Sequence, residues 1–148
     1  MKVLGIIPAR YSSLRFPGKP LVDIAGKSMI QRVYEQAIKC KDLNKVLVAT
    51  DDDKIFNHVK SFNGNVIITS SNHQSGTDRC AEAVEKIGED YDIIINIQGD
   101  EPTINPFQIS SLIELLKNSK QGIGTLYKKI KSQKAVSYTH LTLPTIYS

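Results

Sequence analysis

The stretch KVLGIIPARYSSLRFPGKP, residues 2–20, joins a continuous apolar run to a loop that carries positive charge and no acidic residue. A short apolar run that ends at Pro8 is typical of a strand buried on both faces of a parallel sheet. Two prolines restrict the loop, and Gly18 permits a positive φ. Such a loop can turn its backbone N–H groups and its cations, Arg10 and Lys19, toward one anion. The residues alone leave two interpretations open, an anion-binding loop or a solvated basic loop.

The rest of the chain alternates short apolar runs with segments whose apolar residues repeat at helical spacing. Beyond the first run, we expect strands at residues 45–51, 65–70, 92–98 and 122–129, and helices at residues 28–38, 51–62, 79–87 and 106–118. Strands that alternate with helices in this way predict an α/β fold with a mainly parallel sheet and helices on both faces.

A polar cluster follows each of the first four expected strands. The clusters are PARYSSLRFPGK (8–19), TDDD (50–53), SSNHQSG (70–76) and QGDEP (98–102). In parallel α/β sheets, ligands bind beyond the carboxyl ends of the strands. We therefore expect all four clusters to open onto one rim of the sheet, and we place the functional site there.

Two of these clusters have more than one interpretation. Asp100 and Glu101 follow the most apolar strand, where a carboxylate could bind Mg²⁺. This ion favours one or two carboxylates together with phosphate oxygens. The alternative is a simple turn, because Gly-Asp and Glu-Pro are common in turns. In the cluster before residue 79, Ser75 or Thr77 could cap a helix, or Gln74 and the backbone nearby could contact the edge of a base. Both interpretations can hold together.

Composition sets limits on the class of protein. The chain has 148 residues, a net charge of +4 and a pI near 9.0, but its basic residues are scattered among acids, without the basic stripe of a nucleic-acid-binding protein. No apolar run approaches the ~20 residues of a membrane span, and no signal peptide is evident. Cys40 and Cys80 lack neighbours at metal-ligand spacing and fit a reducing compartment. We expect one cytoplasmic domain with an acidic small-molecule substrate.

The segments IIPARYSSLRFPGKPLVDIAGKSMI, ATDDDKI, NHQSGTDRCAE and INIQGDEP, in this order and spacing, resemble the 3-deoxy-manno-octulosonate cytidylyltransferases, or CMP-KDO synthetases. The resemblance runs from about residue 1 to 134 and implies a truncated Rossmann-like nucleotidyltransferase fold. It implies transfer of CMP from CTP to 3-deoxy-D-manno-octulosonate (KDO) with release of pyrophosphate, for lipopolysaccharide synthesis. It also implies Mg²⁺ as cofactor, a homodimer for an intact family member, and neither nucleic acid nor membrane as partner.

The resemblance assigns residues as well. Arg10 and Lys19 match phosphate-binding cations, and Asp100 matches a Mg²⁺ ligand; these three form the expected catalytic group. The expected nucleotide-binding residues are Pro8, Ala9, Arg10, Ser13, Arg15, Lys19, Gln74, Ser75, Gly76 and Gln98. Two alternatives stay open: a related nucleotidyltransferase for another sugar acid, and a non-catalytic nucleotide-binding fragment.

The composition changes near the end of the chain. VSYTHLTLPTIYS, residues 136–148, has no charged residue and departs from the family pattern, and it resembles translated adapter sequence joined to a truncated gene. We expect residues 1–135 to be the nucleotide-binding part of a cytidylyltransferase domain and residues 136–148 to be a non-native tail. Such a chain is expected to aggregate and to have little or no activity.

Overall fold

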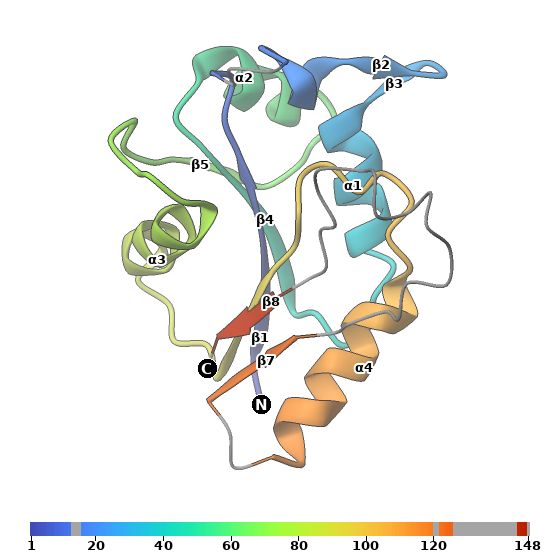
Figure 1. The fold of residues 1–148 in the computed structure, drawn as a ribbon, viewed down its shortest axis with the longest axis vertical. Helices are drawn as coiled ribbons and strands as arrows, with labels where there is room; N and C mark the ends of the chain where they lie inside the picture. The colour runs from blue at the N-terminus through green and yellow to red at the C-terminus, as the bar shows by residue number, and fades with distance from the viewer. Residues whose placement is uncertain (13–15, 120–121, 126–144, 148) are drawn as a thin grey trace, which may run out of the picture.

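β1 (Val3–Ala9) lies inside the sheet and has a parallel partner on each side. The computed structural model describes residues 1–12, 16–119, 122–125 and 145–147. The other strands of this sheet are β4 (Lys45–Thr50), β5 (Val66–Ile68), β6 (Ile93–Asn96), β7 (Ile123–Thr125) and β8 (Thr145–Tyr147). The strand order is β5-β4-β1-β6-β8-β7 (Figure 1). The first four strands of this order are parallel, whereas β8 is antiparallel to β6 and to β7.

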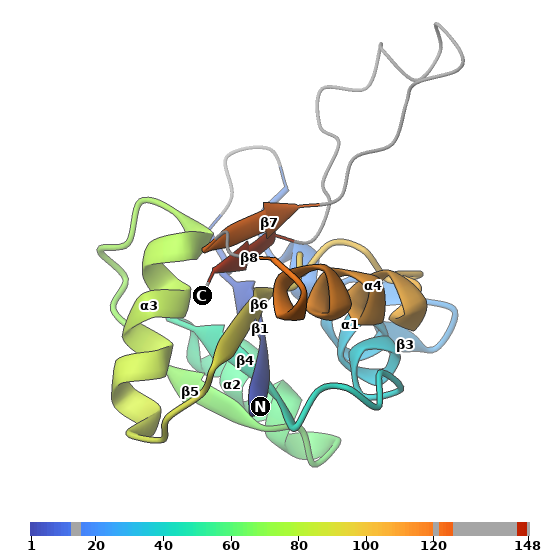
Figure 2. The same cartoon turned by 90° about the horizontal axis from the view of Figure 1, so that it is seen from below.

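Helices cover both faces of the sheet. They are α1 (Met29–Ala37), α2 (Asp53–Ser61), α3 (Gly76–Ile87) and α4 (Pro106–Lys117). α3 lies on one face, and α1 and α4 lie on the other (Figure 2). The core beneath α3 contains Leu4, Ile6, Leu47, Ala49, Cys80 and Ala83. The larger core on the opposite face includes Val3, Ile7, Ile30, Val33, Val48, Ile55, Val59, Ile109 and Leu112. The predicted α/β fold with a mainly parallel sheet is confirmed. No helix in the described ranges is both long enough and apolar enough to span a membrane.

Side chains that cap the helices fix where α2, α3 and α4 begin. Asp52 Oδ1 accepts hydrogen bonds from the N–H groups of Lys54 and Ile55, at 2.8 and 3.1 Å. Ser75 Oγ accepts one from the Asp78 N–H at 3.1 Å, so α3 begins three residues earlier than the apolar pattern predicts. α4 begins at Pro106, as expected, because proline has no N–H to leave unpaired in a first turn.

Two elements lie where the sequence pattern did not predict them. After the 3₁₀ turn η1 (Lys19–Leu21), a hairpin joins β2 (Asp23–Ile24) to β3 (Lys27–Ser28) through Ala25 and Gly26, whose φ angles are 50° and 85°. A turn with two positive φ angles is usually marked by Asn-Gly or Asp-Gly, and alanine is rare there. The second element is β8, which lies within residues 136–148. Most of that segment is outside the described residues, and its non-native origin stays a prediction.

Glu89 links three segments at the amino ends of the strands, on the opposite side of the sheet from the rim. Its carboxylate accepts hydrogen bonds from Lys45 Nζ and Lys2 Nζ, both at 3.0 Å, and from the Tyr91 hydroxyl at 2.9 Å. The bond from Lys45, followed by those from Lys2 and Tyr91, lowers the pKa of Glu89 from 4.5 to about 2. A lowered carboxyl pKa stabilises the fold above the ordinary value, and this contribution is lost as the pH falls toward 2.

We expect Glu89→Gln to be less stable than the unchanged protein above pH 4.5, with the difference shrinking as the pH falls toward 2. Urea unfolding midpoints measured across this pH range check the prediction. Glu85→Gln is the control, because Glu85 is an exposed glutamate of α3 outside this cluster. A difference between Glu89→Gln and the unchanged protein that stays constant in acid would contradict the prediction.

Candidate functional site

Loops that follow different strands meet at the carboxyl end of β1. A Cβ atom added to Gly76, at the start of α3, would lie 3.2 Å from Pro8 Cγ. One added to Gly99, after β6, would lie 3.0 Å from the backbone oxygen of Pro8. Only residues without a side chain allow both segments to approach β1 so closely. The polar clusters after β1, before α3 and after β6 therefore share one rim, as predicted.

A pocket of about 170 Å³ opens at this meeting point. Its walls are formed by Pro8, Ala9, Arg10, His73, Gln74, Ser75, Gly76, Arg79 and Gln98. Every predicted nucleotide-binding residue in the described part of the chain lines this pocket, except Lys19. Ser13 and Arg15 lie outside the described residues. The structure thus brings the predicted set together, and the role of these residues in binding stays a prediction.

Lys19 lies in a second part of the rim, where it pairs with Asp100. Lys19 Nζ is 2.8 Å from Asp100 Oδ2, and both side chains are partly exposed. The loop that carries Lys19 is closed by a hydrogen bond from the Gly18 N–H to the Tyr11 oxygen at 2.9 Å. Gly18 uses the positive φ that the sequence permits, at 72°, and a Cβ there would lie 3.2 Å from the Tyr11 ring. The cation expected to contact phosphate and the carboxylate expected to bind metal are therefore in direct contact.

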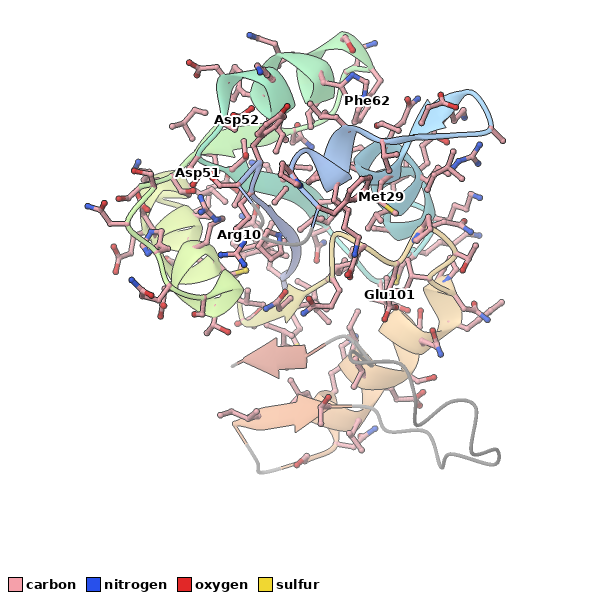
Figure 3. The ribbon with its side chains drawn as sticks, turned by 45° about the horizontal axis from the view of Figure 1, so that its top comes forward. Arg10, Met29, Asp51, Asp52, Phe62 and Glu101 are labelled. Carbon is pink, nitrogen blue, oxygen red and sulfur yellow. The ribbon has the colours of Figure 1, made fainter. Side chains whose placement is uncertain are left out.

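The rim has two sides. Figure 3 shows Arg10 and Asp51 on the side of the rim near α3, whereas Glu101 lies toward α4. Arg10 is exposed and lines the pocket, and Gln98, two residues before Asp100, lines it as well. The loop after β1 carries both Arg10 and Lys19, and the loop after β6 carries both Gln98 and Asp100. The two loops that hold the Lys19–Asp100 pair therefore also form part of the pocket wall. A ligand with an uncharged part and an anionic part could occupy the pocket and contact the pair.

Sequence reasoning missed Arg79, which lines the pocket and is buried, with only 3% of the residue exposed. Its Nη2 atom lies 3.0 Å from Asp51 Oδ2, and its Nη1 atom donates to Thr69 Oγ1 at 2.6 Å and to the Ser70 oxygen at 3.3 Å. Arg79 therefore connects the ends of β4 and β5 to the first turn of α3. The signal available in the sequence was a charged residue directly beside Cys80, which belongs to the apolar face of α3.

His73 belongs to the loop before α3 and forms part of the pocket wall. Its Nε2 atom forms a short hydrogen bond with Glu82 Oε2. The same carboxylate accepts the Ser70 N–H at 2.8 Å and lies 2.7 Å from Lys86 Nζ. The bond from Lys86, followed by those from His73 and Ser70, lowers the pKa of Glu82 to about 2. Glu82 therefore stays ionised at neutral pH and holds the segment before Gln74 against α3.

Comparison with known proteins gives the same family as the motifs. A family model described as Cytidylyltransferase matches residues 4–145. A Parabacteroides distasonis protein named 3-deoxy-manno-octulosonate cytidylyltransferase is 59% identical over 133 residues, which are 89% of this chain and 52% of that protein. A protein of the same name from Bacteroides thetaiotaomicron is 53% identical over 128 residues, 86% of this chain and 50% of that protein. The chain thus spans about half the length of the curated relatives it matches.

Solved structures agree. The structure of a CMP:2-keto-3-deoxy-manno-octonic acid synthetase complexed with CTP has a TM-score of 0.81 and 44% identity, covering 84% of this chain and 52% of that one. A cytidylyltransferase from Leptospira borgpetersenii has a TM-score of 0.78 at 24% identity, over 100% of this chain and 60% of that one, which shows a shared fold. With the family model matched over residues 4–145, this chain belongs to the cytidylyltransferase family.

Proposed function

We propose that this chain binds CTP at the rim and forms the nucleotide-binding part of an enzyme that transfers CMP from CTP to KDO. The observation that carries the proposal is the pocket at the end of β1, which gathers residues from three loops beside the Lys19–Asp100 pair. The names of relatives at 53–59% identity, and the CTP complex of a structural neighbour at 44%, support the choice of nucleotide and sugar.

In this reaction, the anomeric hydroxyl of KDO attacks the α-phosphate of CTP in line, and pyrophosphate leaves. Phosphoryl-type transfer depends mainly on positioning and on stabilisation of the developing charge. Arg10 and Lys19, at the two ends of the loop after β1, would hold the triphosphate and offset negative charge on the departing pyrophosphate. The pocket would hold the base, which sets the position of the α-phosphate relative to these cations.

Asp100 is the residue that would hold a Mg²⁺ ion. Among the described residues, no group of three or more histidine, cysteine, aspartate or glutamate side chains could enclose a metal by itself. This arrangement suits Mg²⁺, which commonly binds one or two carboxylates and takes its other ligands from substrate phosphates and water. When bound, the ion would neutralise phosphate charge and acidify the attacking hydroxyl. Lys19 engages Asp100 Oδ2 in the free protein and keeps that carboxylate in place.

We propose a cytoplasmic location and, for an intact family member, a homodimer. Cys40 and Cys80 are free thiols buried in the core, which fits a reducing compartment. The dimer rests on the family resemblance alone.

Calorimetric titration of the chain with CTP, UTP, ATP and GTP in the presence of Mg²⁺ tests the proposal. We expect CTP to bind most tightly, because a structural neighbour at 44% identity is complexed with CTP and because a pocket of this size suits one small ring beside the loop proposed to hold phosphate. A parallel assay of pyrophosphate release with CTP and KDO then separates a catalytic chain from a non-catalytic nucleotide-binding one. Preference for another nucleotide, or no binding of CTP, would contradict the proposal.

A further inference from the structure

We propose that His73 selects cytosine over uracil, by accepting a hydrogen bond from the exocyclic amino group of the base at its Nδ1 atom. This inference rests on the proposed function and names the residue of the same site that sets the choice of base. His73 is a residue of the pocket wall, and only 20% of its side chain is exposed. It directly precedes Gln74, Ser75 and Gly76, which line the same pocket.

The backbone around His73 is held in place from several directions. Glu82 accepts the Ser70 N–H at 2.8 Å, and Arg79 donates to the Ser70 oxygen at 3.3 Å. At the other end of the segment, Ser75 Oγ caps α3 by accepting the Asp78 N–H at 3.1 Å. A ring mounted on such a segment has little freedom to move away from a ligand in the pocket.

Glu82 determines which nitrogen of His73 carries the proton. The carboxylate faces Nε2, and it is ionised because donors from Lys86, His73 and Ser70 lower its pKa to about 2. An ionised carboxylate accepts and cannot donate, so the proton of the neutral imidazole lies on Nε2. Nδ1 is then an obligatory acceptor. Among the described residues, Nδ1 has no hydrogen-bond partner.

The two pyrimidines differ at the position that such an acceptor can test. Cytosine presents an amino group, which donates, whereas uracil presents a carbonyl oxygen in its place, which accepts. An acceptor that faces the amino group gains a hydrogen bond, and one that faces the carbonyl leaves two acceptors in contact. The pocket volume of about 170 Å³ is below the ~300–1,000 Å³ of pockets that enclose whole drug-sized ligands, which fits one base.

The other polar side chains of the pocket cannot make this distinction. The amides of Gln74 and Gln98 can rotate to present either a donor or an acceptor. The Ser75 hydroxyl is already engaged with Asp78, donating to Oδ2 at 2.7 Å and accepting the N–H at 3.1 Å. Arg10 only donates, and a donor suits the ring carbonyl that both pyrimidines share. Arg79 already donates to Asp51, Thr69 and Ser70. His73 is therefore the polar side chain of the pocket whose fixed acceptor can distinguish cytosine from uracil.

The test compares the affinities for CTP and UTP, measured by calorimetry near neutral pH, in the unchanged chain and in His73→Phe. His73→Phe keeps a ring and removes both nitrogens, so we expect the preference for CTP over UTP to fall by about tenfold. Glu82→Gln, which no longer fixes the proton on Nε2, should lower the preference in the same direction. Ser71→Ala is the matched control, because Ser71 is exposed in the same loop and lies outside the pocket wall.

The outcomes are distinguishable. If CTP binds but the preference is unchanged in His73→Phe and in Glu82→Gln, this inference is wrong and the proposed function stands. If Ser71→Ala lowers the preference as much as His73→Phe, the effect belongs to the loop and the inference is again wrong. If the unchanged chain binds neither CTP nor UTP, the proposed function itself fails, and the inference fails with it.

Discussion

Replacing Arg79 with methionine should lower the free energy of unfolding by about 3–5 kcal/mol, because it leaves a buried carboxylate without its partner. The side chains of Arg79 and Asp51 are only 4% and 12% exposed, and their atoms Nη2 and Oδ2 are 3.0 Å apart. The substitution also removes the donor from Thr69 Oγ1, which is buried. Urea unfolding followed by circular dichroism measures the loss.

A double substitution separates the charge from the packing. In Arg79→Met/Asp51→Asn, no uncompensated charge is buried, so we expect part of the lost stability to return. Arg32→Met is the matched control: Arg32 donates to the backbone oxygens of Ile24 and Ala25 near the surface and forms no ion pair with a carboxylate in the described part of the chain. A loss for Arg79→Met no larger than that for Arg32→Met would contradict the prediction.

The role of Arg79 also bears on the pocket. Its guanidinium contacts the Ser70 oxygen, and the segment that follows carries His73 and Gln74 into the pocket wall. Loss of this contact should loosen the wall even in a variant that still folds. Arg79 is therefore a positioning residue in the proposed function, since its own donors are already engaged within the protein.

The fold was predictable where local patterns decide it. The apolar runs at 2–8 and 92–98 are buried in β1 and β6, and the polar clusters after them meet at one rim because parallel strands end on the same side. Gly76 and Gly99 belong to these clusters, but the sequence pattern does not predict that they pack against Pro8. That contact depends on the distance between two loops, which the spacing of residues along the chain does not contain.

The parts that could not be predicted depend on contacts across the fold. Arg79 is one charged residue among many in the sequence, and its burial follows from Asp51, which lies 28 positions earlier in the chain. Glu82 lies nine positions after His73, a separation at which no helical pairing rule applies, because α3 begins between them. The turn at Ala25 could not be predicted either, because alanine rarely adopts a positive φ and so gives no signal for one in the sequence.

Lys19→Ala should weaken CTP binding by about 10- to 100-fold, as expected for the loss of one charge-assisted contact to phosphate. The Lys19–Asp100 pair, at 2.8 Å, adds a second cost that depends on metal. Without Mg²⁺, the substitution leaves the Asp100 carboxylate uncompensated beside the triphosphate, and like charges repel. Calorimetric titration of CTP with and without Mg²⁺ measures both effects, and Lys39→Ala, at an exposed lysine beyond α1, is the control.

The double variant Lys19→Ala/Asp100→Asn decides whether Asp100 acts on the nucleotide through its charge. Without Mg²⁺, it should bind CTP more tightly than Lys19→Ala, because the repelling carboxylate is gone. With Mg²⁺, the order should reverse, because an amide is a much weaker Mg²⁺ ligand than a carboxylate. An order that does not depend on Mg²⁺ would show that Asp100 does not hold the ion. Equal CTP affinities for Lys19→Ala and the unchanged chain would show that Lys19 does not contact phosphate. The loop after β1 would then be a solvated basic loop.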